Sequence, residues 1–329
     1  MKKKLGVIGS GQIVPFHLDA ALAAGFQLES IGSKASSSSH RELAEKWGGN
    51  ALSSWEHVLS SDLDALLIAS HLDSLEHILE TAMSLDIPIL CEKPGSLSSE
   101  RLSQLKRLPA AGKTLFGYNR RHYSSVDQMK NYANTNEPIL IRAEAPEFSW
   151  TDSYNLAERD LNVLSNTVHF FDLINYLFDG PELEFPIQAS SSSHPGFATV
   201  VLMTNKLGGR NQIGSLSLSF GSPSNYSISV SKPGGKAVLE PLEFFEEYRG
   251  LSVKEPSDEN PIRTYSPNSI GRSELRPSEK KFKPGFLGQM RELYSLSEGG
   301  SLSELKSATF DDAIGALQFA ERVNERLNS

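Results

Sequence analysis

Short apolar runs alternate with amphipathic segments over the first third of the chain. We predict strands at residues 4–8, 27–32, 65–69, 88–91 and 114–118. Between them, apolar residues recur at helical spacing, which predicts helices at residues 14–24, 41–47, 75–85 and 99–108. Asp73 and Ser98 are the expected N-caps of the last two helices. Strands joined by helices in this order are typical of parallel sheets, so residues 1–119 are predicted to form a doubly wound, Rossmann-type α/β domain.

The pattern changes after residue 119, where strands follow one another without intervening helices. One helix is expected at residues 163–178, and after it we predict strands at residues 184–189, 197–205, 212–220, 226–231 and 236–239. Leu216, Leu218 and Phe220 occupy alternate positions, which directs one face of the sheet toward a core. The second domain, residues 120–329, is therefore predicted to be α+β with a large, mainly antiparallel sheet.

Two further segments complete this second domain. Residues 241–284 are rich in Pro, Ser and charge and show little periodicity, so we expect long surface loops or an oligomer contact there. Near the end of the sequence, five apolar residues recur at helical spacing: Ile314, Leu317, Ala320, Val323 and Leu327. We expect this C-terminal helix to pack back on the first domain.

The composition agrees with two folded domains and excludes several functions. A chain of 329 residues is long enough for two domains of ~100 to 200 residues each. Its 32 Lys and Arg against 40 Asp and Glu give a net charge of -8, which makes nucleic acid a poor partner. No apolar run approaches the ~20 residues of a membrane span, and no signal-type segment precedes the first strand, so we expect a cytoplasmic protein without a membrane partner. The single cysteine, Cys91, excludes an internal disulfide and a thiolate-rich metal site.

A glycine-rich turn follows the first strand and opens the first helix. Here the backbone of Gly9, Gly11, Gln12 and Ile13 could approach a pyrophosphate at the helix N-terminus. The fingerprint is incomplete, because Val14 stands where a third small residue is expected. A glycine turn that binds nothing is the alternative, but the position after the first strand of such a sheet favours a dinucleotide site.

The end of the second strand bears on the choice between NAD and NADP. An acidic residue that binds the adenosine ribose is usual there, but this chain has Ser33 and Lys34. Ser33 could donate a hydrogen bond to a 2′-phosphate and Lys34 could pair with it, with His40 or Arg41 in reserve. We expect NADP or NAD, with NADP favoured; the alternative is that Lys34 is a solvated loop lysine.

Candidate chemistry begins after the strand at residues 88–91. Ligands of open α/β sheets bind at the carboxyl ends of the strands, so Glu92 and Lys93 are directed toward a cleft and are candidates for cofactor contact. The Lys93 ammonium can also hydrogen-bond a substrate hydroxyl and favour the alkoxide that forms as hydride leaves. Cys91 is expected to be an inert strand residue.

A second group of candidates lies on the helix expected at residues 163–178. His169 and Asp172 are three residues apart and share one face, which Ser165 and Tyr176 extend by a turn in each direction. Histidine can take or return an alcohol proton, and a nearby carboxylate can orient it or hold a substrate hydroxyl. A structural hydrogen bond between the two side chains is the alternative.

Residues next to these two segments could complete a substrate site. Asn119, Arg120 and Arg121 follow the last strand of the first domain, where one arginine could meet cofactor or substrate, or form a salt bridge between the domains. Trp150 could stack on a sugar ring, although anchoring of the core is the usual role of such a residue.

Taken together, these motifs resemble the Gfo/Idh/MocA family, named for glucose-fructose oxidoreductase, inositol dehydrogenase and a rhizopine-related protein. The resemblance rests on the stretches at residues 9–13, 91–94, 117–122, 168–172 and 285–323. It implies that Lys93 and His169 are the catalytic pair and that Asp172 contacts or orients the substrate. It also implies a tightly held NAD or NADP, a small polyol or sugar substrate, and a homodimer or homotetramer formed through the C-terminal sheet.

Departures from the family pattern leave part of the site open. Val14 replaces the small third residue, Leu75 lies where histidine is frequent, and Ser165 lies where many polyol dehydrogenases have a carboxylate. The leading hypothesis is a metal-independent NAD(P)-dependent oxidoreductase that acts on a secondary alcohol or ketone. The alternatives are a non-catalytic dinucleotide sensor and an NAD-assisted glycosidase. A metal enzyme is least expected, because no His, Cys, Asp and Glu cluster has ligand spacing.

Overall fold

The computed structural model describes residues 2–34, 38–147, 167–178, 187–191, 197–207, 210–220 and 223–327. Its contacts divide the chain into two compact units. The first unit comprises Met1–Tyr123, Phe171–Tyr176 and Pro277–Ala320, and the second comprises Ser124–Phe170, Leu177–Arg276 and Glu321–Ser329. The functional boundary expected between residues 119 and 120 stays a prediction.

The first unit is built on a six-stranded sheet in the order β3-β2-β1-β4-β5-β6, in which every neighbouring pair is parallel. Its strands are β1 Lys3–Ile8, β2 Phe26–Gly32, β3 Asn50–Ala51, β4 Ala65–Ile68, β5 Ile89–Cys91 and β6 Thr114–Phe116. This confirms the predicted Rossmann-type parallel sheet. Because strand order reverses on either side of β1, the carboxyl ends of β1 and β4 form the switch point at which such sheets bind ligands.

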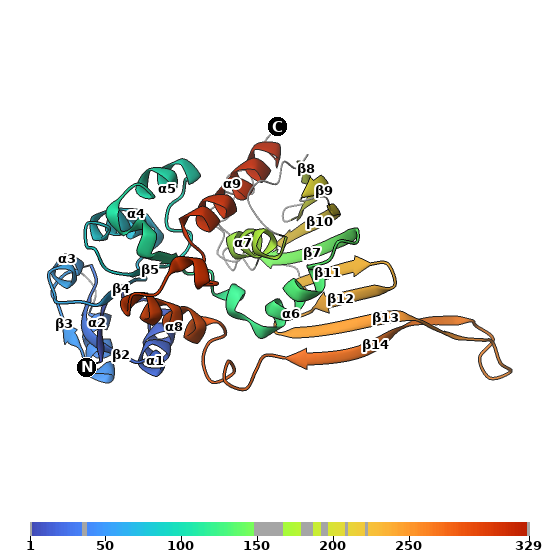
Figure 1. Cartoon of the computed structure of the whole chain (residues 1–329), viewed down its shortest axis with the longest axis horizontal. Helices are drawn as coiled ribbons and strands as arrows, with labels where there is room; N and C mark the ends of the chain where they lie inside the picture. The colour runs from blue at the N-terminus through green and yellow to red at the C-terminus, as the bar shows by residue number, and fades with distance from the viewer. Residues whose placement is uncertain are drawn as a thin grey trace. The chain divides into compact units, whose positions relative to one another are not determined.

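Helices cover both faces of this sheet (Figure 1). In Figure 1, α1 (Val14–Ala24) and α8 (Phe286–Ser297) lie on one side and α4 (Leu72–Ala82) and α5 (Ser99–Leu105) on the other. The remaining helical elements of the unit are α2 Ser39–Trp47, α3 Trp55–Leu59, η1 Pro109–Lys113, η2 Asn119–His122 and η4 Leu302–Glu304. Val14 is fully buried in the core shared by β1, β4, α1 and α8, so its larger side chain fills space between helix and sheet.

Several details of this unit differ from the predictions. The two-residue strand β3 and the short helix α3 were not predicted, because neither is long enough to show a period. The predicted N-cap Asp73 is wrong, since α4 begins at Leu72 and its cap is His71, whose side chain accepts from the Asp73 N–H. Ser98 is confirmed as the N-cap of α5, where it accepts from the Arg101 N–H.

The second unit contains an eight-stranded sheet in the order β14-β13-β12-β11-β7-β10-β9-β8. Its strands are β7 Ile139–Glu147, β8 Ile187–Ser191, β9 Phe197–Leu207, β10 Arg210–Phe220, β11 Ser227–Lys232, β12 Gly235–Leu239, β13 Phe244–Lys254 and β14 Thr264–Glu274. The pair β7 and β10 is parallel and the other described pairs are antiparallel, as the mainly antiparallel prediction requires. Helix α6 (Ser124–Ala133) packs on β12, β13 and β14. Leu216 and Leu218 are fully buried, which confirms the inward face predicted for β10 at these two positions; the Phe220 side chain lies outside the described residues.

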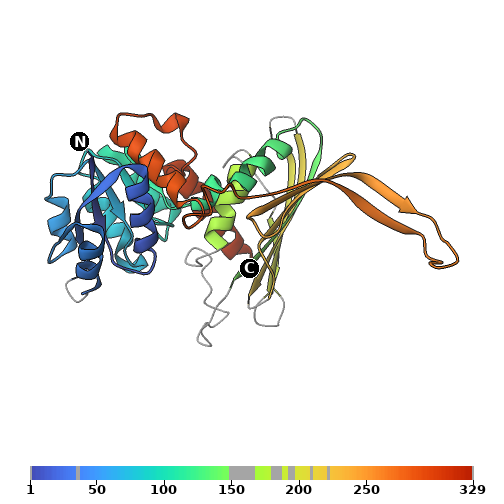
Figure 2. The same cartoon turned by 90° about the horizontal axis from the view of Figure 1, so that it is seen from below.

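The prediction of long loops over residues 241–284 is wrong. Strands β13 and β14 pair there from Phe244 opposite Glu274 to Lys254 opposite Thr264, and they project beyond β12 as a two-stranded arm (Figures 1 and 2). Most of this arm is exposed on both faces, so no apolar side is needed and no alternation is seen in the sequence. Helix α6 and strand β7 were also not predicted.

The last helix, α9, spans Phe310–Leu327. The predicted apolar stripe is buried at Ile314, Leu317, Ala320 and Val323, whereas the Leu327 side chain lies outside the described residues. The part of α9 up to Ala320 belongs to the first unit. No helix in the described ranges is both long and apolar enough to cross a membrane.

Candidate functional site

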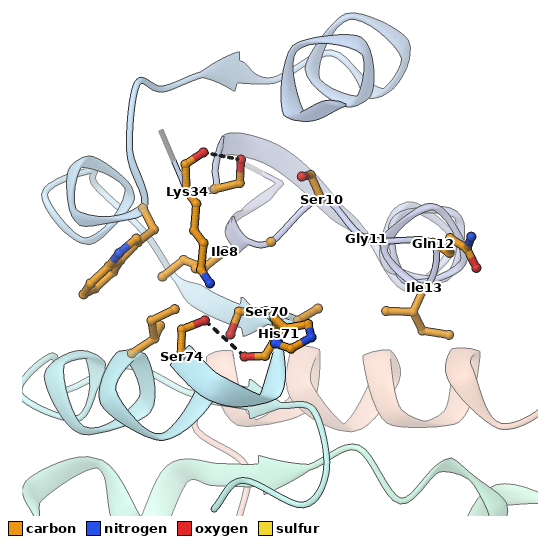
Figure 3. A pocket seen from close by; sticks show the side chains of 14 residues that line it. Ile8, Ser10, Gly11, Gln12, Ile13, Lys34, Ser70, His71 and Ser74 are labelled. Carbon is orange, nitrogen blue, oxygen red and sulfur yellow. Dashed lines mark hydrogen bonds between the residues drawn. The ribbon is translucent and has the colours of Figure 1, made fainter. Parts of the chain in front are cut away.

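A cavity of about 470 Å³ opens at the carboxyl ends of β1, β2 and β4 in the first unit. Figure 3 shows the glycine turn on one wall and the segment that follows β4 on another. The lining residues are Ile8, Gly9, Ser10, Gly11, Gln12, Ile13, Ser33, Lys34, Trp55, Ala69, Ser70, His71, Ser74 and Ile78. The structure therefore brings together six of the predicted cofactor-binding residues, and the cavity lies at the switch point of the sheet.

Glycine is suited to the two positions of the turn, 9 and 11, for different structural reasons. Gly9 has φ of +122°, and a Cβ atom there would lie 2.1 Å from the Ala69 carbonyl oxygen, so only glycine allows β1 and β4 to end side by side. A Cβ on Gly11 would meet no atom within 4 Å, which leaves the backbone at Gly11 open toward the cavity. The Val14 N–H donates to the Gly11 carbonyl at 3.0 Å and starts the helix. These residues fit the pyrophosphate of a dinucleotide at the N-terminus of α1.

Ser33 and Lys34 differ in how they meet the cavity. Ser33 is buried, and its hydroxyl is 3.0 Å from Nδ1 of His40, which is buried too. Lys34 is exposed, and Figure 3 shows its side chain extending into the pocket. The lysine is thus available to an anionic group in the cavity, while the serine is held by His40.

The wall after β4 carries polar residues that the sequence reasoning did not single out. Ser70, His71, Ser74 and Ile78 line the cavity there, whereas Trp55, which also lines it, belongs to α3. Ser74 donates to the His71 carbonyl at 3.1 Å, which shapes the first turn of α4. The signal was present in the sequence, because residues that directly follow a central parallel strand share the ligand-binding edge.

Glu92 and Lys93 follow β5 and do not belong to the cavity lining. The Glu92 carboxylate lies 2.7 Å from Nε2 of His17 and also accepts from the Lys93 N–H at 3.3 Å. Burial acts to raise the pKa of the Glu92 carboxyl, but the hydrogen bond from His17 and the charges of His17 and Lys93 outweigh it and lower that pKa. The Lys93 side chain is half-buried, and the Lys93–Pro94 peptide is cis.

The residues after β6 are held by structural contacts. Asn119 is buried and donates to the Pro284 carbonyl at 2.8 Å. Arg121 is also buried and forms ion pairs with Asp172 of α7 (Thr167–Leu177) and with Asp312 of α9, at 2.6 and 2.9 Å. Its guanidinium also lies over the Tyr176 ring, 4.8 Å from the centroid. Arg121, Asp172 and Asp312 all belong to the first unit, so these ion pairs lie within that unit, and a salt bridge between the domains stays a prediction.

The predicted catalytic helix is α7, which begins at Thr167 within the described residues. Asp172 is buried in the first unit, and burial, only partly offset by Arg121, raises the pKa of its carboxyl to about 6. His169 is half-buried in the second unit, so its predicted pairing with Lys93 stays a prediction. Trp150 and Ser165 lie outside the described residues, and substrate contacts by Asn119, Arg120 and Tyr176 also remain predictions.

A doubly wound parallel sheet with a glycine turn at its switch point is typical of dinucleotide-binding domains. Residues 3–119 match the family described as "Oxidoreductase family, NAD-binding Rossmann fold", GFO_IDH_MocA. The first unit is thus similar to the dinucleotide-binding part of the Gfo/Idh/MocA family, as its motifs indicated.

Relatives and solved structures are similar to the chain over a longer range than this match. The inositol 2-dehydrogenase of Corynebacterium glutamicum is 25% identical over 217 residues, which cover 62% of this chain and 63% of that protein. The match thus spans less than two thirds of the length of this relative. Among solved structures, the UDP-N-acetylglucosamine 3-dehydrogenase GnnA from Acidithiobacillus ferrooxidans has a TM-score of 0.76 at 17% identity, over 100% of this chain and 98% of that one. The myo-inositol dehydrogenase from Lactobacillus casei, in complex with NAD(H) and myo-inositol, has a TM-score of 0.70 at 15% identity, over 99% and 94%. At these identities the structural similarity establishes the fold.

Proposed function

We propose that the protein is an oxidoreductase that transfers hydride between NAD or NADP and a secondary alcohol or ketone of a sugar, nucleotide sugar or cyclitol, without a metal. The observation that carries this proposal is the cavity at the switch point, with Gly11 open toward it and Lys34 reaching into it. The names of the relatives, which are dehydrogenases of inositol and of a UDP-sugar, support the substrate class.

Each wall of the cavity has a part in holding the dinucleotide. Gly9, Gly11, Gln12 and Ile13 would hold the pyrophosphate at the N-terminus of α1, where backbone N–H groups and the helix dipole favour an anion. The adenosine ribose would meet Ser33 and Lys34 at the end of β2. When bound, the nicotinamide supplies the site that accepts or releases hydride.

Lys93 and His169 supply the proton chemistry in this proposal. The Lys93 ammonium would donate a hydrogen bond to the substrate oxygen and stabilise the alkoxide. The His169 imidazole would take the hydroxyl proton during oxidation and return it to the oxygen during reduction. Asp172 would orient the helix that carries His169, and Asn119, Arg120, Ser165, Tyr176 and Trp150 are the candidate substrate contacts.

The experiment is a screen of the purified protein with NAD⁺ and NADP⁺ against myo-inositol, free hexoses and UDP-sugars, with formation of the reduced nicotinamide as the signal. On an accepted substrate, we expect Lys93→Met and His169→Ala each to lower kcat by about 100-fold or more, the usual contribution of a proton-transfer group. If both variants stay within about threefold of wild type, the assignment of this pair is wrong. Arg101→Met, on the outer surface of α5, is the matched control.

The alternatives predict other outcomes of the same screen. A dinucleotide sensor would bind NADH or NADPH and oxidise none of these compounds. An NAD-assisted glycosidase would release a sugar from a glycoside while its cofactor stays bound and is not consumed over many turnovers. Either result would replace the dehydrogenase proposal.

The preference for NADP over NAD is a finer part of the proposal. The two residues directly after β2 are Ser33 and Lys34, and neither is a carboxylate. The Lys34 amine is available to pair with a 2′-phosphate. Ser33 acts less directly, because its hydroxyl is engaged with His40. We therefore propose that Lys34 carries most of the preference for NADP.

A homodimer or homotetramer formed through the C-terminal sheet is also part of the proposal. β14 is the terminal strand of that sheet, and the arm that it forms with β13 exposes large apolar side chains: Leu251, Val253, Ile262, Tyr265 and Ile270. A two-stranded arm gains little from its own packing, so a second copy that covers these side chains would stabilise it. Light scattering coupled to gel filtration should report an oligomer for wild type and a smaller species for Leu251→Asp with Tyr265→Asp. The expected cytoplasmic location stays a prediction.

A further inference from the structure

His17 and Glu92 form a buried polar pair behind the glycine turn. His17 lies on α1, one turn after the residues that line the cavity, and its N–H donates to the Ile13 carbonyl at 3.3 Å. Its side chain is completely buried, and its ring packs against Phe286 of α8 with 4.4 Å between centroids. Nε2 lies 2.7 Å from Oε1 of Glu92, and because a carboxylate only accepts, Nε2 carries the proton.

The other carboxylate oxygen of Glu92 reaches the segment that carries Lys93. Oε2 accepts from the Lys93 main-chain N–H at 3.3 Å, and the Glu92 N–H donates to the Ile68 carbonyl at 2.8 Å in the sheet. A Cβ atom on the neighbouring Gly117 would lie 3.0 Å from the Glu92 carboxyl carbon. Glu92 is therefore confined on one side by Gly117, directly after β6, and on the other by His17, so it has little freedom to move.

We propose that His17 and Glu92 fix the start of α1 to the main chain of Lys93, so that Glu92 is a positioning residue for Lys93 and does not contact the cofactor. Both carboxylate oxygens are engaged by protein donors, and neither Glu92 nor Lys93 lines the cavity. Hydrogen bonds to a charged group are stronger than those between neutral groups, so these contacts favour one backbone arrangement at Lys93. The inference rests on the proposed function only for the catalytic role of Lys93.

The inference can be tested without a substrate. The Lys93 amine is acetylated with an N-hydroxysuccinimide ester, and the rate of acetylation is measured by mass spectrometry. The reference is the acetylation rate of Lys113, which pairs with Asp86 on the surface. The variants are Glu92→Gln, His17→Phe, which keeps a ring but has no N–H, and His17→Gln, whose amide can still donate to Glu92. Glu80→Gln, an exposed partner of Arg101, is the control for loss of a carboxylate. NADH affinity and the unfolding temperature are measured for each protein.

We expect Glu92→Gln and His17→Phe to change the relative acetylation rate of Lys93 by about threefold or more, with NADH affinity altered by less than about threefold. His17→Gln should restore the wild-type rate, and the effects of Glu92→Gln and His17→Phe should not add, because they remove the same link. Should Glu92→Gln fail to fold, the comparison of His17→Phe with His17→Gln still decides the question.

Two results would overturn the proposal. A loss of NADH affinity of about tenfold or more in Glu92→Gln, with wild-type affinity in His17→Phe, would make Glu92 a cofactor contact. A lower unfolding temperature with an unchanged Lys93 rate in both variants would reduce the pair to a fold-stabilising contact. Because no turnover is involved, these results leave the proposed oxidoreductase function to its own test.

Discussion

Two nitrogens of the Arg121 guanidinium donate hydrogen bonds to the carboxylate of Asp172. Nε lies 3.1 and 3.0 Å from the two carboxylate oxygens, and Nη2 lies 2.6 Å from Oδ1. Both side chains are almost completely buried, at 4% and 1% exposure. Both oxygens of this carboxylate are engaged by protein donors, so we propose that Asp172 orients α7, the helix that also carries His169 three residues earlier. The predicted contact of Asp172 with substrate is thereby less favoured than its orienting role.

Loss of one partner of this pair should cost much more stability than loss of a surface ion pair. Arg121→Met leaves Asp172 and Asp312 buried without their cation, and the removal of one partner from a buried pair costs about 3 to 5 kcal/mol. Arg101→Met removes the ion pairs with Glu76 and Glu80 at the surface, where the change should be small. Urea unfolding of the two variants measures the difference. Equal losses would show that the Arg121 ion pairs do not stabilise the fold.

The two carboxylates beside Arg121 should respond to pH in opposite directions. Burial raises the pKa of Asp172 from 3.8 to about 6, so the folded protein binds more protons than the unfolded one between these values. Its contribution to stability is therefore present below pH 3.8 and is lost as the pH rises toward 6. At Asp312, burial acts to raise the pKa but Arg121 and the Thr309 N–H lower it, so its contribution is present above pH 3.8 and is lost as the pH falls further.

Substitution by asparagine separates these contributions. Asp172→Asn should flatten the fall in the free energy of unfolding between about pH 4 and 6, whereas Asp312→Asn should flatten the loss at lower pH. The measurement is the urea midpoint as a function of pH for wild type and both variants. A fall between pH 4 and 6 that is unchanged in Asp172→Asn would assign it to another group.

Periodicity predicted many of the elements that have a buried side, although α6 and β7 bury apolar residues and were not predicted. Strands β1, β4 and β5 lie between two layers of helices and appear in the sequence as continuous apolar runs, and α1 was predicted with the bounds that the structure has. The arm of β13 and β14 has no buried face along most of its length, so nothing in its sequence distinguishes it from a loop. The lack of burial thus explains why the arm was not predicted, but it does not explain α6 and β7.

The site could be predicted as far as the topology fixes it. Gly9, Gly11 and Lys34 follow strands that end at one edge of a parallel sheet, and the structure brings them to one cavity. The engagement of Glu92 by His17 was not predictable in this way, because the two residues are 75 positions apart and nothing local indicates their contact. Side-chain partners of this kind depend on the packing of α1 against the sheet.

The two glycines of the turn should respond differently to the same substitution. Gly9→Ala would place a Cβ 2.1 Å from the Ala69 carbonyl at a positive φ, so we expect a loss of about 1 to 3 kcal/mol or more in stability. The methyl group of Gly11→Ala would meet no protein atom within 4 Å, so the unfolding temperature should stay near that of wild type. NADH affinity should fall, because the methyl group would occupy open space where the pyrophosphate is expected to approach the backbone. Thermal unfolding and NADH titration distinguish the two. Wild-type NADH affinity in Gly11→Ala would argue against pyrophosphate binding at this turn.

The choice of dinucleotide should depend on Lys34. Lys34→Ala removes the cation that reaches into the cavity, so we expect NADPH affinity to fall about tenfold, which corresponds to about 1.4 kcal/mol, with NADH affinity within about twofold of wild type. Lys34→Asp should go further and favour NADH, because a carboxylate after β2 can accept hydrogen bonds from the ribose hydroxyls and repels a 2′-phosphate. Fluorescence titration with both nucleotides measures the ratio, and Lys113→Ala, outside the cavity lining, is the control. Equal losses of NADH and NADPH affinity in Lys34→Ala would place Lys34 at the pyrophosphate and remove the argument for NADP.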